Sequence, residues 1–222
     1  MLKKSMALTA AMAAILSSGS ALADASVNAA ATTNYVWRGV TQSTDTASVS
    51  GGIDWSNASG LYVGVWSGSL VGGTETDVYA GFTSDVGSLG YDVGVLTYQY
   101  SQTPDINFTE LYLNVSLSDL TVGIASTVSA ADGNKTGMFD KGDMYVSASY
   151  GFKAGVFDAS AYGGSYMFEN DNLFGNGDLD YNHYGLSFTS GEVTVALEKN
   201  DIDGANNSNV RVVATWSKAW DL

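Results

Sequence analysis

Apolar and polar residues alternate along most of the chain. Leu111, Leu113 and Val115, for example, are separated by Tyr112 and Asn114. A period of two places apolar side chains on one face of a β-strand and the remaining side chains on the other. The 3.6-residue period of an amphipathic helix is nowhere sustained, so the pattern predicts an all-β protein.

About twelve segments follow this alternation. They lie near residues 25–37, 47–56, 61–69, 75–84, 91–100, 108–117, 120–128, 143–150, 158–168, 181–190, 192–200 and 209–220. Most are longer than the ~5–6 residues usual in soluble sheets and approach the ~9–11 residues that a tilted strand needs to cross a bilayer. Their length therefore favours strands that span a membrane.

The connections between these segments alternate between short and long. The short ones are Asn57–Gly60, Val86–Gly90, Ser118–Asp119, Gly151–Phe157 and the turn around Gly191; the longer ones are Arg38–Thr46, Val71–Thr74, Ser101–Asn107, Ser129–Gly142, Glu169–Asp180 and Asp201–Ser208. Transmembrane barrels have tight periplasmic turns and longer outer loops. The pattern predicts a single antiparallel up-and-down transmembrane β-barrel of about twelve strands. We expect both termini in the periplasm and Gly39–Thr46, Ser129–Gly142 and Glu169–Asp180 outside the cell.

The first 23 residues have the three parts of an export signal. Lys3 and Lys4 precede an apolar run over Met6–Leu16, and Ala21-Leu22-Ala23 supplies the small residues that signal peptidase reads. The apolar run is shorter than the roughly 20 residues that a membrane-spanning helix needs. We therefore expect a cleaved signal peptide over residues 1–23, a barrel domain over residues 24–222, and a location in the outer membrane of a Gram-negative bacterium.

If the apolar face of each strand contacts lipid, the opposite face lines the lumen. The charged and histidine side chains on this second face are those of Arg38, Asp54, Asp77, Asp92, Glu110, Asp143, Asp158, His183, Glu192, Glu198 and Arg211. A charge on the lipid face would cost about 2–4 kcal/mol at the midplane, which explains the segregation. Closure of the sheet is expected to bring Arg38 and Arg211 toward Glu198. Such charges either create a transverse field in a cation-preferring pore or pair and fill a narrow barrel, and the sequence leaves both arrangements open.

The composition narrows the classes of function. The formal net charge of −14 disfavours binding to nucleic acid, and the absence of cysteine excludes disulfides and zinc–cysteine sites. His183 is the only histidine, and Ser187 on the same face lies about 13 Å away along an extended strand, too far for a Ser–His pair. Asp201-Ile202-Asp203-Gly204 lacks the remaining ligands of a calcium loop. We expect no enzyme activity, no cofactor and no metal site.

One stretch near the N-terminus resembles a known family. Thr33-Asn34-Tyr35-Val36-Trp37-Arg38-Gly39-Val40-Thr41-Gln42-Ser43 is similar to the T/S-x-Y-x-x-R-G-x-x-Q-S opening of the TorF family of porins, a proteobacterial outer-membrane group. Further matches are Gly52-Ile53-Asp54-Trp55, Ser59-Gly60-Leu61-Tyr62-Val63-Gly64-Val65-Trp66, Asp77-Val78-Tyr79-Ala80-Gly81, Tyr91-Asp92-Val93-Gly94-Val95 and Thr109-Glu110-Leu111-Tyr112. The resemblance implies a small outer-membrane β-barrel with pore activity. Trp216, Trp220 and Leu222 stand where many outer-membrane proteins end in Phe, and we expect them to signal to the barrel-assembly machinery.

Together these patterns predict a porin-like channel through which small hydrophilic solutes or ions diffuse passively, with a preference for cations. Its expected partners are outer-membrane lipid, lipopolysaccharide, the barrel-assembly machinery and small solutes, but no nucleic acid. Two alternatives stay open. One is a structural or adhesive outer-membrane barrel that conducts nothing, and the other is a soluble periplasmic β-barrel that holds an apolar ligand inside.

Overall fold

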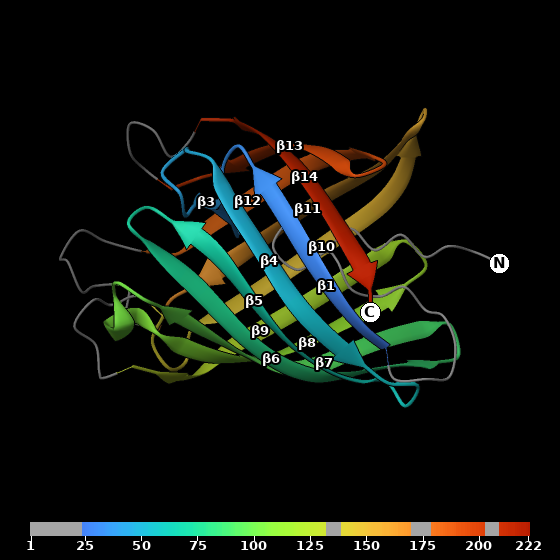
Figure 1. Ribbon diagram of the computed structural model, residues 1–222, viewed down its shortest axis with the longest axis horizontal. Helices are drawn as coiled ribbons and strands as arrows, with labels where there is room; N and C mark the ends of the chain where they lie inside the picture. Colours follow the sequence, from blue (N-terminus) through green and yellow to red (C-terminus); the bar gives the residue numbers. More distant parts are fainter. Residues whose placement is uncertain (1–23, 132–138, 170–178, 203–208) are drawn as a thin grey trace.

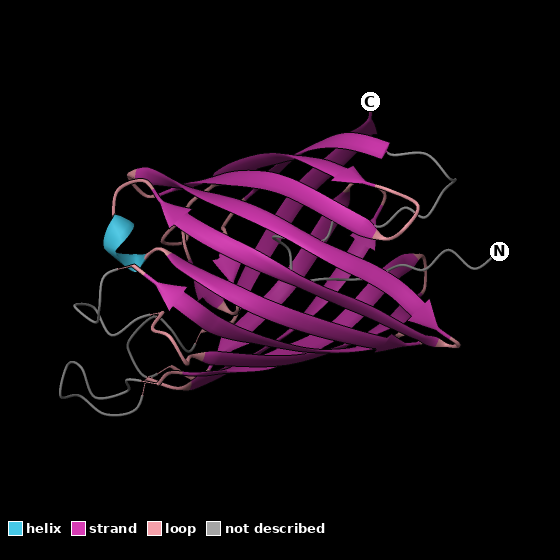
Figure 2. Cartoon of the chain, turned by 90° about the horizontal axis from the view of Figure 1, so that it is seen from below, coloured by secondary structure: helices cyan, strands magenta, loops and turns pink. Residues whose placement is uncertain are grey.

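The computed structural model describes residues 24–131, 139–169, 179–202 and 209–222 of the chain. Within these residues, twelve long strands close into one antiparallel barrel (Figure 1 and Figure 2). The strands are β1 (Asp24–Thr32), β4 (Ser48–Ser56), β5 (Leu61–Leu70), β6 (Gly73–Val86), β7 (Leu89–Tyr100), β8 (Phe108–Leu117), β9 (Leu120–Ala130), β10 (Met144–Ala154), β11 (Phe157–Met167), β12 (Tyr181–Ser190), β13 (Val193–Asn200) and β14 (Arg211–Asp221). The predicted all-β barrel is confirmed.

The barrel is closed by pairing of its first and last strands. β1 runs antiparallel to β14, with Val27 opposite Trp220 and Thr32 opposite Thr215, while its other edge pairs with β4. Beyond β14, the Leu222 N–H donates to the carbonyl of Ala25 at 2.8 Å. Closure therefore satisfies the backbone groups of both edges, which a bilayer requires of any spanning sheet.

Short turns join the strands at the end that carries the termini, hereafter the turn end, and most longer connections lie at the opposite loop end. The turns comprise residues 57–60, 87–88, 118–119, 155–156 and 191–192, and the long connections include 33–47 and 101–107, which holds the single-turn helix η1 (Pro104–Ile106). One expected long link is wrong: Val71–Gly72 alone joins β5 to β6, and Gly72 supports this tight turn with a φ of +78°. The predicted signal peptide (residues 1–23) and most of the predicted loops at 129–142, 169–180 and 201–208 lie outside the described residues.

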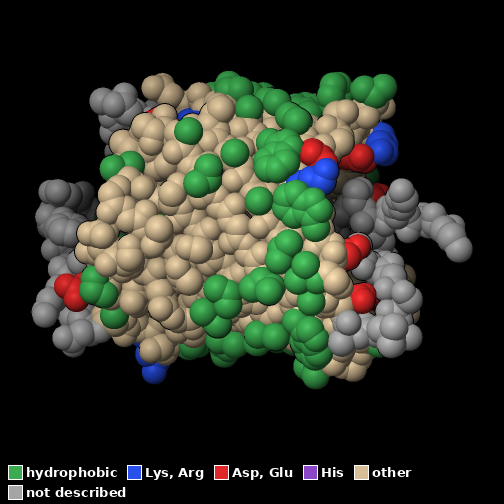
Figure 3. All heavy atoms as spheres, viewed as in Figure 1, with side chains coloured by type: hydrophobic (Ala, Val, Ile, Leu, Met, Phe, Trp, Pro, Cys, Tyr) green, Lys and Arg blue, Asp and Glu red, His purple; other side chains and the backbone are tan. Residues whose placement is uncertain are grey.

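The outer wall of the barrel is apolar. Val63, Leu113, Ile124 and Leu186 are each about two-fifths exposed, and they alternate along their strands with residues that face the interior. Hydrophobic side chains are spread over the wall in Figure 3, whereas charged side chains gather toward the two ends. No helix among the described residues is long and apolar enough to cross a membrane. This distribution matches the lipid-facing band of a transmembrane barrel.

Inward-facing glycines make room for inward-facing tyrosines. Tyr79 lies opposite Gly64, and Tyr162 lies opposite Gly185. A Cβ atom on Gly185 would stand only 2.6 Å from the hydroxyl and ring of Tyr162. Two further tyrosine–glycine pairs, Tyr62–Gly81 and Tyr112–Gly94, follow the same arrangement. Each ring therefore lies on a cross-strand glycine along the wall.

Replacing Gly185 with alanine should destabilise the barrel by about 1–3 kcal/mol, because the new methyl group overlaps the ring of Tyr162. The effect should be much smaller in a Tyr162→Ser background, where the ring is absent. The temperature at which the detergent-folded barrel loses its fast electrophoretic migration measures the change. Equal losses in the two backgrounds would show that the ring contact is not the cause.

Candidate functional site: the barrel lumen

The segment between β1 and β4 forms a small hairpin that folds into the barrel. β2 (Val36–Trp37) and β3 (Val40–Thr41) pair with each other, and Arg38 and Gly39 form the turn between them. Their φ angles of +47° and +79° are those of a type I′ turn, the two-residue turn whose twist suits a hairpin. The predicted first strand therefore ends at Thr32 and not near residue 37.

Arg38 anchors the tip of this hairpin in the interior. Its two terminal nitrogens donate to both oxygens of Glu110 on β8, at 2.8 and 2.7 Å. The guanidinium carbon also lies 4.3, 4.1 and 5.1 Å from the ring centres of Trp37, Tyr145 and Tyr166. The side chains of Arg38 and Glu110 are 9 % and 3 % exposed. This bidentate, desolvated ion pair is a strong link between the hairpin and the wall.

Further contacts hold the rest of the segment. The Tyr35 hydroxyl donates to Glu75 on β6 at 3.2 Å, and the Asn200 amide donates to the carbonyl of Gly39 at 2.7 Å. At the loop-end rim, Asp45 accepts a hydrogen bond from Arg211 at 2.8 Å. The hairpin is thus attached to strands on several sides of the barrel.

Aromatic side chains pack around the hairpin at the loop end. Trp37 makes edge-on contacts with Tyr98, Phe108 and Phe139, at ring separations of 5.6 to 6.3 Å. Phe108 stacks on both Tyr98 and Phe139, at 4.3 and 4.5 Å. Tyr166, fully buried, joins the same cluster. Hairpin and aromatic cluster together narrow the lumen at this level.

Below the hairpin, carboxylates on the wall are hydrogen-bonded to tyrosines. Tyr79 donates to Asp54, and Tyr162 donates to Glu198. Tyr62 donates to Asp92 at 2.5 Å. Asparagines complete two of these groups: Asn28 donates to Asp54, and Asn114 to Asp92. These tyrosine and asparagine partners are neutral, so they orient the carboxylates without cancelling their charge.

A family model described as a bacterial protein of unknown function (Gcw_chp) matches residues 17–220. The chain belongs to the Gcw_chp family. No protein of curated function matches it in sequence. The resemblance to TorF porins stays a prediction. The porin-like barrel that this resemblance implies agrees with the observed fold.

Solved structures share the architecture of this Gcw_chp barrel at low sequence identity. The KdgM porin is 11 % identical, with a TM-score of 0.53 over 88 % of this chain and 98 % of KdgM. KdgM in complex with disordered oligogalacturonate gives 9 % identity and a TM-score of 0.50 over 90 % and 98 % of the two chains. A protein from a study of in-meso crystallization of membrane proteins is 9 % identical, with a TM-score of 0.59 over 89 % of this chain and 83 % of that protein. These likenesses establish a porin-like fold.

Most of the residues predicted to line the pore face the interior of the Gcw_chp barrel. Asp54, Asp77, Glu110, His183, Glu198 and Arg211 are buried there, and Asp92 is half-buried. The His183 ring stacks on Tyr145, and its Nε2 lies 2.7 Å from the Tyr145 hydroxyl. A Cβ atom on Gly39 would stand 2.3 Å from the Cβ of His183, so the histidine packs directly against the hairpin turn.

Two predicted residues lie at the ends of strands. Asp143 immediately precedes β10; it is buried and accepts a hydrogen bond from the Glu169 N–H at 2.8 Å. Burial raises the pKa of Asp143 to about 6. Asp158 begins the inward face of β11 and forms an exposed ion pair with Lys153, its cross-strand neighbour at the turn end.

Two expectations about this set are wrong. Glu192 lies in the turn before β13, where its carboxylate binds Trp216 and Lys218 on the outer face of β14 and does not line the lumen. Hydrogen bonds from Lys218 and Trp216 lower the pKa of Glu192. Arg38 pairs with Glu110 and does not join Glu198 and Arg211, because the chain turns inward after Thr32. For the same reason Gly39 is buried and not displayed, although Thr44–Thr46 are exposed.

Other lumen residues were absent from the predicted set. Glu75 is buried beside Asp77 on β6, and Lys153 faces inward opposite Asp158. Strand alternation could have identified both residues, because residues two apart in a strand share a face. Glu75 is two residues from Asp77, and Lys153 is two residues from Gly151, which lies on the inner face. Asp45, the partner of Arg211, lies in a connection and carried no such signal. Among the described residues, no three His, Asp or Glu side chains are grouped to hold a metal ion.

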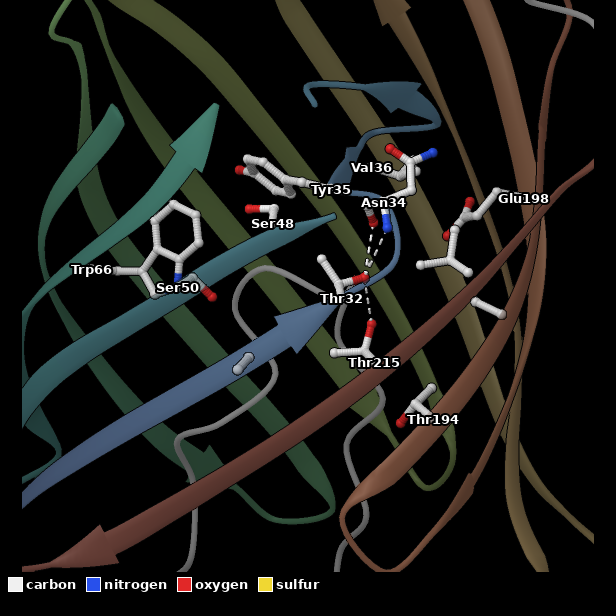
Figure 4. A pocket seen from close by; sticks show the side chains of 13 residues that line it. Thr32, Asn34, Tyr35, Val36, Ser48, Ser50, Trp66, Thr194, Glu198 and Thr215 are labelled. Carbon is white, nitrogen blue, oxygen red and sulfur yellow. Dashed lines mark hydrogen bonds between the residues drawn. The ribbon is translucent and has the colours of Figure 1, made fainter. Parts of the chain in front are cut away.

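A cavity lies beside the hairpin, against the wall where the barrel closes. Its volume is about 40 Å³, which is room for a few water molecules. Side chains from β1, β4, β5, β13, β14 and the hairpin segment line it, and Figure 4 shows Trp66 and Ser50 on one side facing Thr194, Thr215 and Glu198 on the other. Most of the side chains that line this small cavity are buried.

Proposed function

We propose that this protein is a porin-like channel of the outer membrane that lets small hydrophilic solutes or ions diffuse passively, with a preference for cations. The observation that carries the proposal is the inside-out distribution of polarity: an apolar outer wall surrounds a lumen lined by carboxylates, tyrosines and hydroxyls. A soluble barrel that stored an apolar ligand would have the opposite distribution.

The inward hairpin serves as the constriction of this channel. Its tip carries Arg38 across to Glu110, and aromatic rings pack around it inside the barrel. A short segment folded into a barrel can set the size of the solutes that pass without altering the wall. The channel would therefore admit small solutes and exclude large ones.

Charge on the lumen wall favours cations and neutral solutes. Asp54 and Asp92 are bound by tyrosine and asparagine, so their negative charge acts on the lumen. The structurally similar KdgM was solved with oligogalacturonate, an acidic sugar chain. The acidic wall of the present barrel supports a different preference, away from such polyanions.

The surroundings of the channel follow from the same proposal. Residues 1–23 would direct export and be removed, the turn end would face the periplasm, and the loop end would face lipopolysaccharide outside the cell. The exposed set Trp216, Trp220 and Leu222 would be read by the barrel-assembly machinery. No enzymatic step is part of the proposed function.

A non-conducting structural barrel is the second candidate, and the packing of the loop end favours it. Liposome swelling separates the two. Vesicles containing the purified protein should swell in isosmotic glycerol or arabinose and hardly at all in a large neutral oligosaccharide. If vesicles with the folded protein swell no faster than empty ones in any solute, the channel proposal fails and the structural barrel is favoured.

A further inference from the structure

The segment Phe139–Asp143, just before β10, packs into the aromatic cluster around the hairpin. The Phe139 ring stacks on Phe108 at 4.5 Å and lies edge-on to Trp37 of the hairpin at 5.8 Å. Its φ of +64° is one that bulky residues seldom adopt, so holding the ring in this place costs free energy. A modest change in the neighbouring contacts can therefore decide whether the segment stays docked.

Asp143 fixes the other end of this segment. Its N–H donates to the carbonyl of Asp140 at 3.1 Å, and its own carbonyl accepts the N–H of Thr127 on β9 at 2.9 Å. Its carboxylate Oδ1 accepts the N–H of Glu169 at 2.8 Å. The Asp143 side chain thus joins the connection before β10 to the connection after β11.

The second carboxylate oxygen of Asp143 lacks a hydrogen-bond donor. This atom, Oδ2, is buried without a partner, and so are the hydroxyl oxygens of Thr127 and Tyr166. Thr127 lies beside Asp143, and both side chains face the interior. An ionised carboxylate brings only acceptors, whereas a protonated one brings an O–H donor to a place that has none. The docked segment therefore fits a neutral Asp143 better than an ionised one.

The charges around Asp143 act in the same direction. The titratable or charged groups near it are Glu110 on β8 with its partner Arg38, Asp140 and Lys141 in its own segment, Tyr145 on β10, Tyr166 on β11 and Glu169 beyond β11. Arg38 is bound to Glu110 by two hydrogen bonds, and Lys141 is exposed. Burial raises the pKa of Asp143 to about 6, and repulsion from Asp140 and Glu110 adds to the increase.

We propose that Asp143 is a pH-sensitive latch, which keeps Phe139–Asp143 docked on the hairpin when it is protonated and lets the segment leave the lumen when it is ionised. The effect of the latch on transport rests on the proposed channel function: the docked segment narrows the lumen, and its release widens it.

The direction of the pH response follows from the carboxyl group. Because the pKa of Asp143 is raised in the docked state, protonation favours docking, and this contribution is lost as the pH rises through about 6. If the released carboxyl group titrates at its ordinary value of about 3.9, the ratio of released to docked segment should rise about tenfold between pH 5 and pH 8. The channel should therefore be narrower in acid.

Planar-bilayer recordings of the full-length barrel at pH 5 and pH 8 test the effect on transport. We expect the mean conductance of the unmodified protein to be about twofold larger, or more, at pH 8. Asp143→Asn carries a hydrogen-bond donor and no charge, like the protonated carboxyl group, so its conductance should stay low at both pH values. The matched control Asp201→Asn neutralises an exposed carboxylate at the same end and should keep the full response.

Thiol labelling measures release of the segment without any conduction. The chain has no cysteine, so Thr127→Cys places a single buried thiol beside Asp143. At pH 8 this thiol should react at least about tenfold faster than the thiol of Thr127→Cys/Asp143→Asn, and the difference should shrink to about twofold at pH 4. Comparing the two proteins at one pH removes the pH dependence of the thiol itself.

Fast electrophoretic migration before heating confirms that each variant is folded. The proposal is overturned if the unmodified protein conducts as well at pH 5 as at pH 8, if Asp143→Asn keeps the full pH response, or if the two thiols react at equal rates at pH 8. A barrel that passes no current but shows the labelling difference would refute the channel and keep the latch. A barrel that conducts without either response would do the reverse.

Discussion

Replacing Arg38 with alanine should raise the single-channel conductance of the barrel several-fold. The change removes both hydrogen bonds to Glu110 and the contacts with Trp37, Tyr145 and Tyr166. Breaking a buried ion pair by removing one partner typically costs about 3–5 kcal/mol, because the other charge stays buried and unpaired. If the hairpin left its docked position, water could hydrate the unpaired Glu110. The lumen would then be wider, because the hairpin would no longer occupy it. Planar-bilayer recordings measure the conductance.

Two controls test whether the ion pair is responsible. The double variant Arg38→Ala/Glu110→Ala leaves no unpaired charge, so its conductance should lie below that of Arg38→Ala. Lys153→Ala removes a basic residue from the ion pair at the turn end and should leave the conductance nearly unchanged. If Arg38→Ala conducts like the unmodified protein, the hairpin does not limit the current.

Neutralising Asp54 and Asp92 together to asparagine should reduce the cation preference roughly twofold or more, because these carboxylates concentrate cations in a narrow, low-dielectric lumen. They accept hydrogen bonds from tyrosines and asparagines, which do not offset the charge. At 0.15 M salt the screening length is about 8 Å, so wall charges are felt across a narrow bore. Reversal potentials under a salt gradient give the ratio of cation to anion permeability.

The control for this prediction is Asp201→Asn. Asp201 is exposed at the loop end, where it accepts hydrogen bonds from Asn182, and salt screens it more fully. Its neutralisation should barely change the selectivity. A larger effect from Asp201 than from Asp54 and Asp92 would place the selective charge outside the lumen. Strand parity also places Glu110 among the lumen carboxylates. Because its charge is offset by Arg38, neutralising Glu110 would be a poor test of cation selectivity.

The strands of the barrel wall could be predicted from the sequence, because the alternation of apolar and polar residues within each strand reflects its two faces. Alternation over residues 108–117 and 181–190 coincides with β8 and β12 over their whole lengths. Parity then placed Asp54, Asp77 and Glu198 in the interior. The same reasoning failed at Glu192, one residue outside β13, because a side chain in a turn no longer follows the pleat of the strand.

The inward hairpin could not be predicted because its stabilising contacts are distant in sequence. Arg38 and Glu110 are 72 residues apart, and Gly39 and Asn200 are 161 residues apart. The Trp37-Arg38-Gly39-Val40 stretch does contain a glycine in a two-residue turn, but type I′ turns favour Asn-Gly or Asp-Gly over Arg-Gly. The motif that carries the family resemblance is thus the segment that enters the lumen.

Single-channel recording of the unmodified protein in a planar bilayer tests whether the barrel is a cation-preferring channel. We expect small, stable conductance steps with a reversal potential that favours cations. Protein that is folded and inserted, as shown by fast migration before heating and by flotation with lipid vesicles, yet gives no conductance or an anion-selective one, would contradict this expectation.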